Sequence, residues 1–237
     1  MGDWFPCALL VIMLPRGPGA PDEWAVRVAG PGFVLGARSG TDWGIIACMT
    51  PALSHTGRLL VATPVLTDPN FARAVVLLLD HDAQGALGVV LNRPTPVDIA
   101  SVLDGWADLA GRPSVVFQGG PVALDSALAI ALVPGEEGHA EPLGWRRVHG
   151  AIGLVDLEAP PEVLAGELGG LRVFAGYSGW SPGQLENELE EGAWYLLDCE
   201  PGDVFSPDPE RLWRTVLRRQ RGPLAMLATY PDDPTMN

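Results

Sequence analysis

The chain has 237 residues, 47% hydrophobic and 19% charged, which excludes a wholly disordered protein because so apolar a chain can bury a sizeable core. Its formal net charge of −14 repels phosphate backbones and argues against general nucleic-acid binding. All 15 basic side chains are arginine, and the 3 cysteines form no C-x-x-C pair, so neither a disulfide framework nor a zinc site is expected. A reducing cytoplasm is the expected compartment.

The first 48 residues differ from the rest of the chain. Residues 7–14 form an apolar run too short to span a bilayer, and Asp3 gives the wrong charge for the start of a signal peptide. No hydrophobic period follows this run. We expect residues 1–48 to be a disordered extension or a stretch that precedes the true initiator, Met49, and residues 49–237 to form one domain.

From Gly57 onward, short apolar runs alternate with turns. Strands are predicted at 58–63, 74–79 and 85–91, and the continuous apolar run 74–79 indicates a strand covered on both faces. A helix is predicted from Thr95, as its cap, to Trp106.

Further strands are predicted at 115–117, 127–133, 148–154, 171–174 and 194–197, with helices at 161–168 and 208–219. Strands and helices are mixed but do not alternate regularly, which disfavours a doubly wound sheet. The predicted fold class is therefore α+β, in a single domain.

Residues 174–194, FAGYSGWSPGQLENELEEGAW, predict a strand, a glycine-rich turn and a helix. Ser181 as N-cap with Gln184 three residues later has the pattern of a capping box. The turn 176–180 is similar to a G-x-S-x-G nucleophile elbow around Ser178, but Trp180 stands where the second glycine belongs. A tight turn in which the glycines permit unusual backbone angles is the preferred interpretation.

Asp80, His81 and Asp82 could act in metal binding or acid–base catalysis, together with Arg93. The other histidines lack ligand spacing, so no metal site is predicted, and a polar hairpin end explains the triplet. Cys199 has no basic sequence neighbour that would lower its pKa and is predicted to be a packing residue. An enzyme of unrecognised, hydrolase-like type remains an alternative.

A basic cluster spans Arg211 to Arg221, in which Arg211, Arg214 and Arg218 share a helix face. An anionic ligand or DNA could bind there, and DNA binding would make the protein a transcriptional regulator. No aromatic platform for base stacking accompanies the cluster, so cations that stabilise a helix end are the preferred explanation. The bend 119–121 could hold an anion in a backbone nest but lacks a phosphate-loop lysine.

Four segments together resemble the AlgH/YqgE family of bacterial proteins. They are GRLLVATPVLTDPNFARAVVLLLDHDAQGALGVVLNRP (57–94), FQGGPV (117–122), the segment 174–194 and VFSPDPERLW (204–213). The resemblance implies a bifurcated mixed β-sheet that includes a small closed barrel and is surrounded by helices. It implies no catalytic residue and no cofactor, because the family has no established activity. Transcriptional regulation has been proposed for AlgH, whose fold contains no recognised DNA-binding motif.

The favoured interpretation is a cytoplasmic, non-enzymatic regulatory or binding protein with a protein partner. No membrane span is expected, nucleic acid is not expected, and the oligomeric state is open. The contact surface is predicted to combine three turns, at 92–94, 119–121 and 176–184, that meet in space. Its candidate binding residues are Asn92, Arg93, Gly119, Gly120, Pro121, Gly176, Tyr177, Gly179, Trp180 and Gln184.

Overall fold

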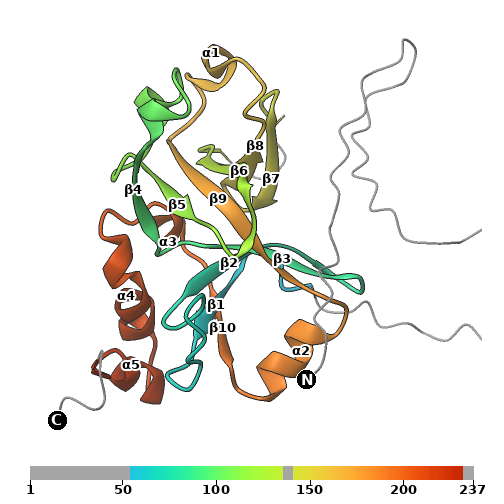
Figure 1. Ribbon diagram of the computed structural model, residues 1–237, viewed down its shortest axis with the longest axis vertical. Helices are drawn as coiled ribbons and strands as arrows, with labels where there is room; N and C mark the ends of the chain where they lie inside the picture. Colours follow the sequence, from blue (N-terminus) through green and yellow to red (C-terminus); the bar gives the residue numbers. More distant parts are fainter. Residues whose placement is uncertain (1–53, 136–140, 232–237) are drawn as a thin grey trace, which may run out of the picture. The chain divides into compact units, whose positions relative to one another are not determined.

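A ten-stranded β-sheet organises the residues that the computed structural model describes, 54–135 and 141–231 (Figure 1). These residues all belong to one unit, Met49–Asn237. The predictions made for residues 1–48, and the boundary at Met49, lie outside the described residues.

Strands and helices are mixed along the chain, and this confirms the predicted α+β class. The strands are β1 (Arg58–Ala62), β2 (Val75–Asp82), β3 (Gly85–Val90), β4 (Pro94–Asp98), β5 (Val115–Gln118), β6 (Val122–Leu132), β7 (Trp145–His149), β8 (Ile152–Val155), β9 (Gly170–Trp180) and β10 (Trp194–Asp198). The α-helices are α1 (Pro161–Leu164), α2 (Gln184–Glu190), α3 (Pro201–Val204), α4 (Leu212–Arg219) and α5 (Pro223–Leu227). Three 3₁₀ turns are η1 (Ile99–Ser101), η2 (Ala107–Leu109) and η3 (Pro209–Arg211).

The sheet forks at β9. The middle of β9 pairs antiparallel with β6 on one edge and parallel with β5 on the other, where Phe174 lies opposite Phe117. The last residues of β9 pair instead with β3, where Ser178 lies opposite Gly88. One branch therefore runs through β3, β2, β1 and β10, and the other contains β4 to β8.

Both faces of the first branch are buried, as the apolar run 74–79 predicted. Leu77 of β2 belongs to a core cluster with Trp213 of α4, whereas its neighbour Leu78 belongs to a second cluster with Leu185 of α2. Successive strand residues point to opposite faces, so α4 and α2 cover opposite sides of this branch, as Figure 1 shows.

The small closed barrel expected from the family resemblance is absent, and that prediction is wrong. Within the described residues β4 pairs with β5 alone and β7 pairs with β8 alone, so the second branch curls into an open half-barrel. Side chains fill its interior: Ile99 and Trp106 pack with Trp145 of β7 and Leu164 of α1. Packing of these segments stabilises the branch where further strand pairing would have closed a barrel.

The helix predicted from Thr95 to Trp106 is also wrong. Its first residues form β4, and only the 3₁₀ turns η1 and η2 follow. The Thr95 hydroxyl donates to the Val116 carbonyl at 2.6 Å, which ties β4 to β5 where the prediction had it capping a helix. Asp98 is the cap, because its carboxylate accepts the Ala100 N–H at 2.9 Å.

Glycines allow β5 and β9 to touch through their main chains. A Cβ on Gly120 would lie 2.2 Å from the carbonyl carbon and oxygen of Tyr177, and a Cβ on Gly119 would lie 2.3 Å from the Gly176 carbonyl oxygen. Gly176 itself has a φ of +69°, which L residues rarely adopt. We call Gly119, Gly120 and Gly176 the glycine crossing. Residues 176–180, predicted as a turn, are the end of β9, so that prediction is wrong.

Arg172 ties β9 to the segment that follows β10. Its side chain is 1% exposed, stacks over the Phe117 ring at 4.2 Å, and donates to the Val204 and Ser206 carbonyls at 2.6 and 2.9 Å. A third bond, 3.1 Å long, goes to the Arg112 carbonyl. Burial lowers the pKa of this guanidinium to about 10, so its carbonyl bonds offset a considerable desolvation cost.

Substitution of the glycine crossing is expected to unfold the fork. Gly120→Ala should lower the free energy of unfolding by at least ~3 kcal/mol, because the new methyl group can be accommodated only by separating the main chains. Gly202→Ala is the matched control, since nothing lies within 4 Å of its added Cβ, and it should change stability by less than ~0.5 kcal/mol. Urea unfolding measures both, and equal stabilities would contradict the role of the crossing.

Candidate functional site

The predicted binding residues fall into two places. The turns 92–94 and 119–121 meet each other and Gly176, because the Gln118 N–H donates to the Arg93 carbonyl at 2.8 Å and the Gly119 N–H donates to the Ala175 carbonyl at 2.8 Å. The meeting point is the buried glycine crossing, with Pro121 exposed beside it. Binding by these residues stays a prediction.

Asn92 and Arg93 both bond to the segment before β2. The Asn92 side chain is buried, accepts the Val75 N–H at 2.9 Å and donates to the Arg73 carbonyl at 2.9 Å. The Arg93 guanidinium donates to the Ala72 carbonyl, and burial lowers its pKa. These side chains therefore hold the chain's own loop in place.

Trp180 ends β9 and Gln184 begins α2, and both lie apart from the crossing. The Glu188 carboxylate accepts the indole N–H of Trp180 at 2.9 Å, the indole N–H of Trp194 at 2.8 Å and the Gln184 amide at 2.9 Å. We call this group the Glu188 clamp. The amino-acid sequence gives no sign that Glu188 joins two indoles.

One half of the predicted capping box forms at the start of α2. The Ser181 N–H donates to the Gln184 side-chain oxygen at 3.0 Å. The residue at the N-cap is Gly183, with a left-handed φ of +76°, so Ser181 lies two residues before it. The turn that the motif predicts is therefore at 181–183, after β9 has ended.

The Glu188 clamp is expected to stabilise the packing of α2. Glu188→Ala should lower the free energy of unfolding by ~2–4 kcal/mol, since it leaves two indole donors without their charged acceptor. Glu190→Ala, an exposed position on the same helix, should change it by less than ~0.5 kcal/mol. Tryptophan fluorescence during urea unfolding follows both, and a neutral Glu188→Ala would contradict the assignment.

His81 is buried, 6% exposed, and both nitrogens of its ring are used. Nδ1 accepts the His55 backbone N–H at 3.0 Å, so the ring proton is on Nε2, which donates to Glu186 Oε1 at 2.7 Å. The His55 ring stacks on it, with centroids 5.0 Å apart. The Ser54 hydroxyl donates to the His81 backbone carbonyl, so it makes no bond to the ring.

The groups of the hydrolase-like alternative are separated or engaged. Asp80 and Asp82 are exposed, and Arg93 bonds to the chain before β2 begins, whereas His81 lies near the end of that strand. Ser178 is buried, and its hydroxyl donates to the Gly119 carbonyl at 3.2 Å. No cluster of three or more His, Cys, Asp or Glu side chains that could hold a metal occurs in residues 54–135 and 141–231.

Cys199 packs against the core cluster that contains Trp213. Burial raises the pKa of the Cys199 thiol to about 12, with the nearby Asp203 carboxylate contributing in the same direction. A thiol with so high a pKa is a weak nucleophile near neutral pH. The packing role predicted from the sequence agrees with this environment.

The His55–His81–Glu186 group is expected to make stability depend on pH. Burial lowers the pKa of His55 below 6.5, and the hydrogen bond from its own backbone N–H, followed by that from His81, lowers the pKa of Glu186 below 4.5. The unfolded chain therefore takes up protons at a higher pH than the folded one. Stability should fall as the pH drops below 6.5 for His55 and below 4.5 for Glu186.

Urea midpoints measured at pH 7, 5.5 and 4 test this dependence. Glu186→Gln should lose less stability than the wild type between pH 5.5 and 4, because its amide oxygen still accepts from His81 but does not titrate. Glu190→Gln, exposed on the same helix, is the control and should follow the wild-type curve. Identical pH curves for the wild type and Glu186→Gln would contradict the prediction.

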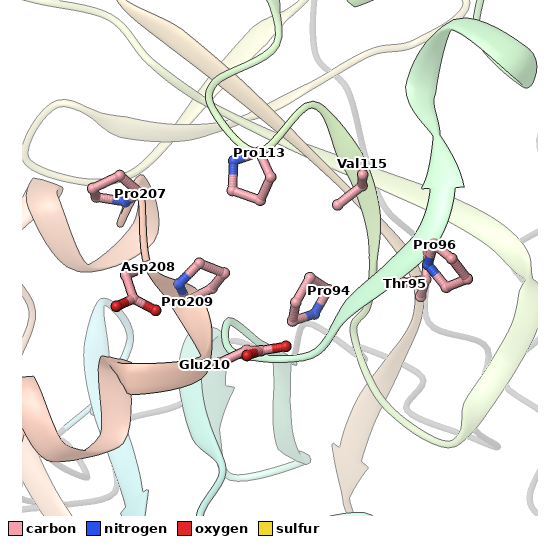
Figure 2. A pocket seen from close by; sticks show the side chains of 9 residues that line it. All are labelled: Pro94, Thr95, Pro96, Pro113, Val115, Pro207, Asp208, Pro209 and Glu210. Carbon is pink, nitrogen blue, oxygen red and sulfur yellow. The ribbon is translucent and has the colours of Figure 1, made fainter.

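Asp208 lines two hollows among the described residues. The first, of 440 Å³, is shown in Figure 2, and we call it the proline-lined hollow. Its lining comprises Pro94, Thr95, Pro96, Pro113, Val115, Pro207, Asp208, Pro209 and Glu210. In Figure 2 the Glu210 side chain extends toward the Pro94 ring.

The second hollow has a volume of 270 Å³, and we call it the arginine hollow. Its lining comprises Asp208, Arg211, Arg214, Thr215 and Arg218. The sequence predicted the shared helix face of these arginines but not the concavity beside them.

In the part of the chain that the structure describes, these features define an α+β protein with a forked sheet, in which His81 and Ser178 are engaged in internal bonds. Among the described residues no helix is long and apolar enough to cross a membrane. The chain belongs to the AlgH-like family, DUF179, whose family model matches residues 59–225, and this confirms the resemblance found in the sequence.

Relatives and solved structures agree with this membership. A UPF0301 protein of Streptomyces coelicolor is 74% identical over 190 residues, which cover 80% of this chain and 98% of that protein. A UPF0301 protein of Thermobifida fusca is 50% identical over 194 residues, which cover 78% of this chain and 96% of that protein. The crystal structure of the protein DIP2367 from Corynebacterium diphtheriae matches with a TM-score of 0.69 at 30% identity. The match covers 74% of this chain and 92% of that one. The solution structure of AlgH from Pseudomonas aeruginosa matches with a TM-score of 0.54 at 28% identity. The match covers 76% of this chain and 96% of that one.

Proposed function

We propose that this protein is a cytoplasmic, non-enzymatic binding protein that acts on a protein partner through the proline-lined hollow. The observation that carries the proposal is the composition of that hollow. Five proline rings from three separate segments line it, together with two carboxylates and neither a histidine nor a cysteine. Such a lining suits recognition better than proton transfer or nucleophilic attack at neutral pH.

Proline makes this surface rigid before any partner arrives. Its ring fixes φ and removes a rotatable side chain, so less conformational entropy is lost on binding than at a flexible surface. The remaining chemistry of the hollow is the negative charge of Asp208 and Glu210. The occupant we infer is therefore a segment with an aromatic or aliphatic side chain beside an arginine or lysine.

Charge also favours a basic partner at longer range. A formal net charge of −14 attracts cationic surfaces and speeds their encounter with the protein. The candidate residues at the glycine crossing would then support the hollow from within, because Pro94 follows Arg93 directly. Contact with the partner would be made by the proline rings and by Glu210.

Quantitative capture of partners from the native cytoplasm tests the proposal. The full-length chain, its Glu210→Arg variant and its Glu167→Arg variant are used as bait, and Glu167 is exposed just after α1. The Glu210→Arg variant should capture at least ~10-fold less of the main protein partner, because its new positive charge repels the partner's cation. Glu167→Arg has the same charge change and should retain it. Equal capture by both variants would exclude the hollow as the contact surface.

A further inference from the structure

The lining of the arginine hollow is positively charged, whereas the chain as a whole is negatively charged. Arg211, Arg214 and Arg218 face the hollow together with the single carboxylate of Asp208, so three guanidinium groups and one carboxylate leave its lining with a formal charge of +2. The whole chain has a formal charge of −14. Arg214 and Arg218 are four residues apart on α4, a spacing at which like charges are neighbours on the helix surface and repel each other.

Other arginines near this helix are bound to the protein itself. Arg219 of α4 forms ion pairs with Asp203 and Glu200. The Arg73 guanidinium lies over the Trp213 ring, 4.8 Å from its centroid. Their surroundings show how this fold engages a guanidinium that it uses for structure.

In the hollow, two of the three arginine side chains, Arg211 and Arg218, are exposed to solvent. The Arg211 side chain is 79% exposed, and its Nε lies 3.8 Å from the Asp208 carboxylate. Arg218 is exposed. Arg214 is half-buried and donates to the Ala228 carbonyl at 2.7 Å, a bond that holds its guanidinium at the base of the group. One positioned guanidinium and two exposed ones thus surround the same space.

We propose that the arginine hollow binds a small phosphate-bearing anion, with a diphosphate group as the preferred ligand. Guanidinium groups bind phosphate oxygens through paired, charge-assisted hydrogen bonds. The Thr215 hydroxyl lies in the same lining and donates to the Arg211 carbonyl at 3.1 Å, so it contacts a phosphate oxygen only by leaving that carbonyl.

The size and the borders of the hollow favour a small ligand over a nucleic acid. Its volume of 270 Å³ is slightly below the ~300–1,000 Å³ of pockets for drug-sized molecules. A duplex would extend beyond the hollow toward Glu210, whose carboxylate repels phosphates. This ligand is separate from the protein partner proposed above and is recognised by a different set of side chains.

Calorimetric titration of the full-length chain with inorganic pyrophosphate at constant ionic strength tests the proposal. We expect saturable binding at one site, weakened at least ~10-fold in Arg211→Ala and in Arg218→Ala, because each removes a charge-assisted bond from an exposed position. Arg146→Ala is the matched control, since Arg146 is exposed on β7, and it should bind like the wild type. Absence of saturable binding, or binding that Arg211→Ala and Arg218→Ala leave unchanged, would overturn the proposal.

A second measurement separates the small anion from DNA. Fluorescence anisotropy of a short labelled duplex, at the same ionic strength, should show no binding that depends on Arg211 and Arg218. Duplex binding that is lost in those variants and not displaced by pyrophosphate would overturn the proposal and identify a nucleic-acid surface. Neither experiment uses the protein partner, so failure here leaves the partner capture to be judged by itself.

Discussion

The contact between main chains at the glycine crossing is the constraint on which the fork depends. Gly119 and Gly120 let β5 approach β9 closely enough that the Val90 N–H, at the end of β3, donates to the Gly119 carbonyl at 2.8 Å. Both branches of the sheet therefore meet within a few residues. The glycines of FQGGPV and the first glycine of FAGYSGW, Gly176, are required because a side chain there would meet main-chain atoms at less than 3 Å and separate the branches.

Hydrophobic patterns in the sequence predicted the elements that are determined by residues close together in the chain. The apolar run 74–79 predicted a strand buried on both faces, and α4 and α2 cover those faces. The segment beginning at Thr95 has the residues of a helix start, yet a hydrogen bond to Val116 of a neighbouring strand outweighs that propensity. The open half-barrel likewise depends on packing between Trp106 and Trp145, which no periodicity reveals.

The candidate sites could be predicted less well than the strands, because they combine residues that are distant in the sequence. Glu188 lies 8 residues from Trp180 and 6 from Trp194, and the three residues belong to α2, β9 and β10, so no single periodicity relates them. The proline-lined hollow combines residues from β4, β5 and η3, which only the tertiary fold brings together. Asp208 lines both hollows, so an anion that binds Arg211 would alter the charge available to a basic partner next to it.

The pairing of β1 with β10 has a consequence for synthesis on the ribosome. The Arg58 side chain bonds to the Leu197 carbonyl, 139 residues later in the chain. At elongation rates of ~5–20 residues per second, roughly 7–28 s pass between the synthesis of Arg58 and that of Leu197. Arg172 also waits for the carbonyls of Val204 and Ser206 before its charge can be buried. During that interval β1 has an unpaired edge of main-chain N–H and C=O groups, the kind of edge that can pair with another chain.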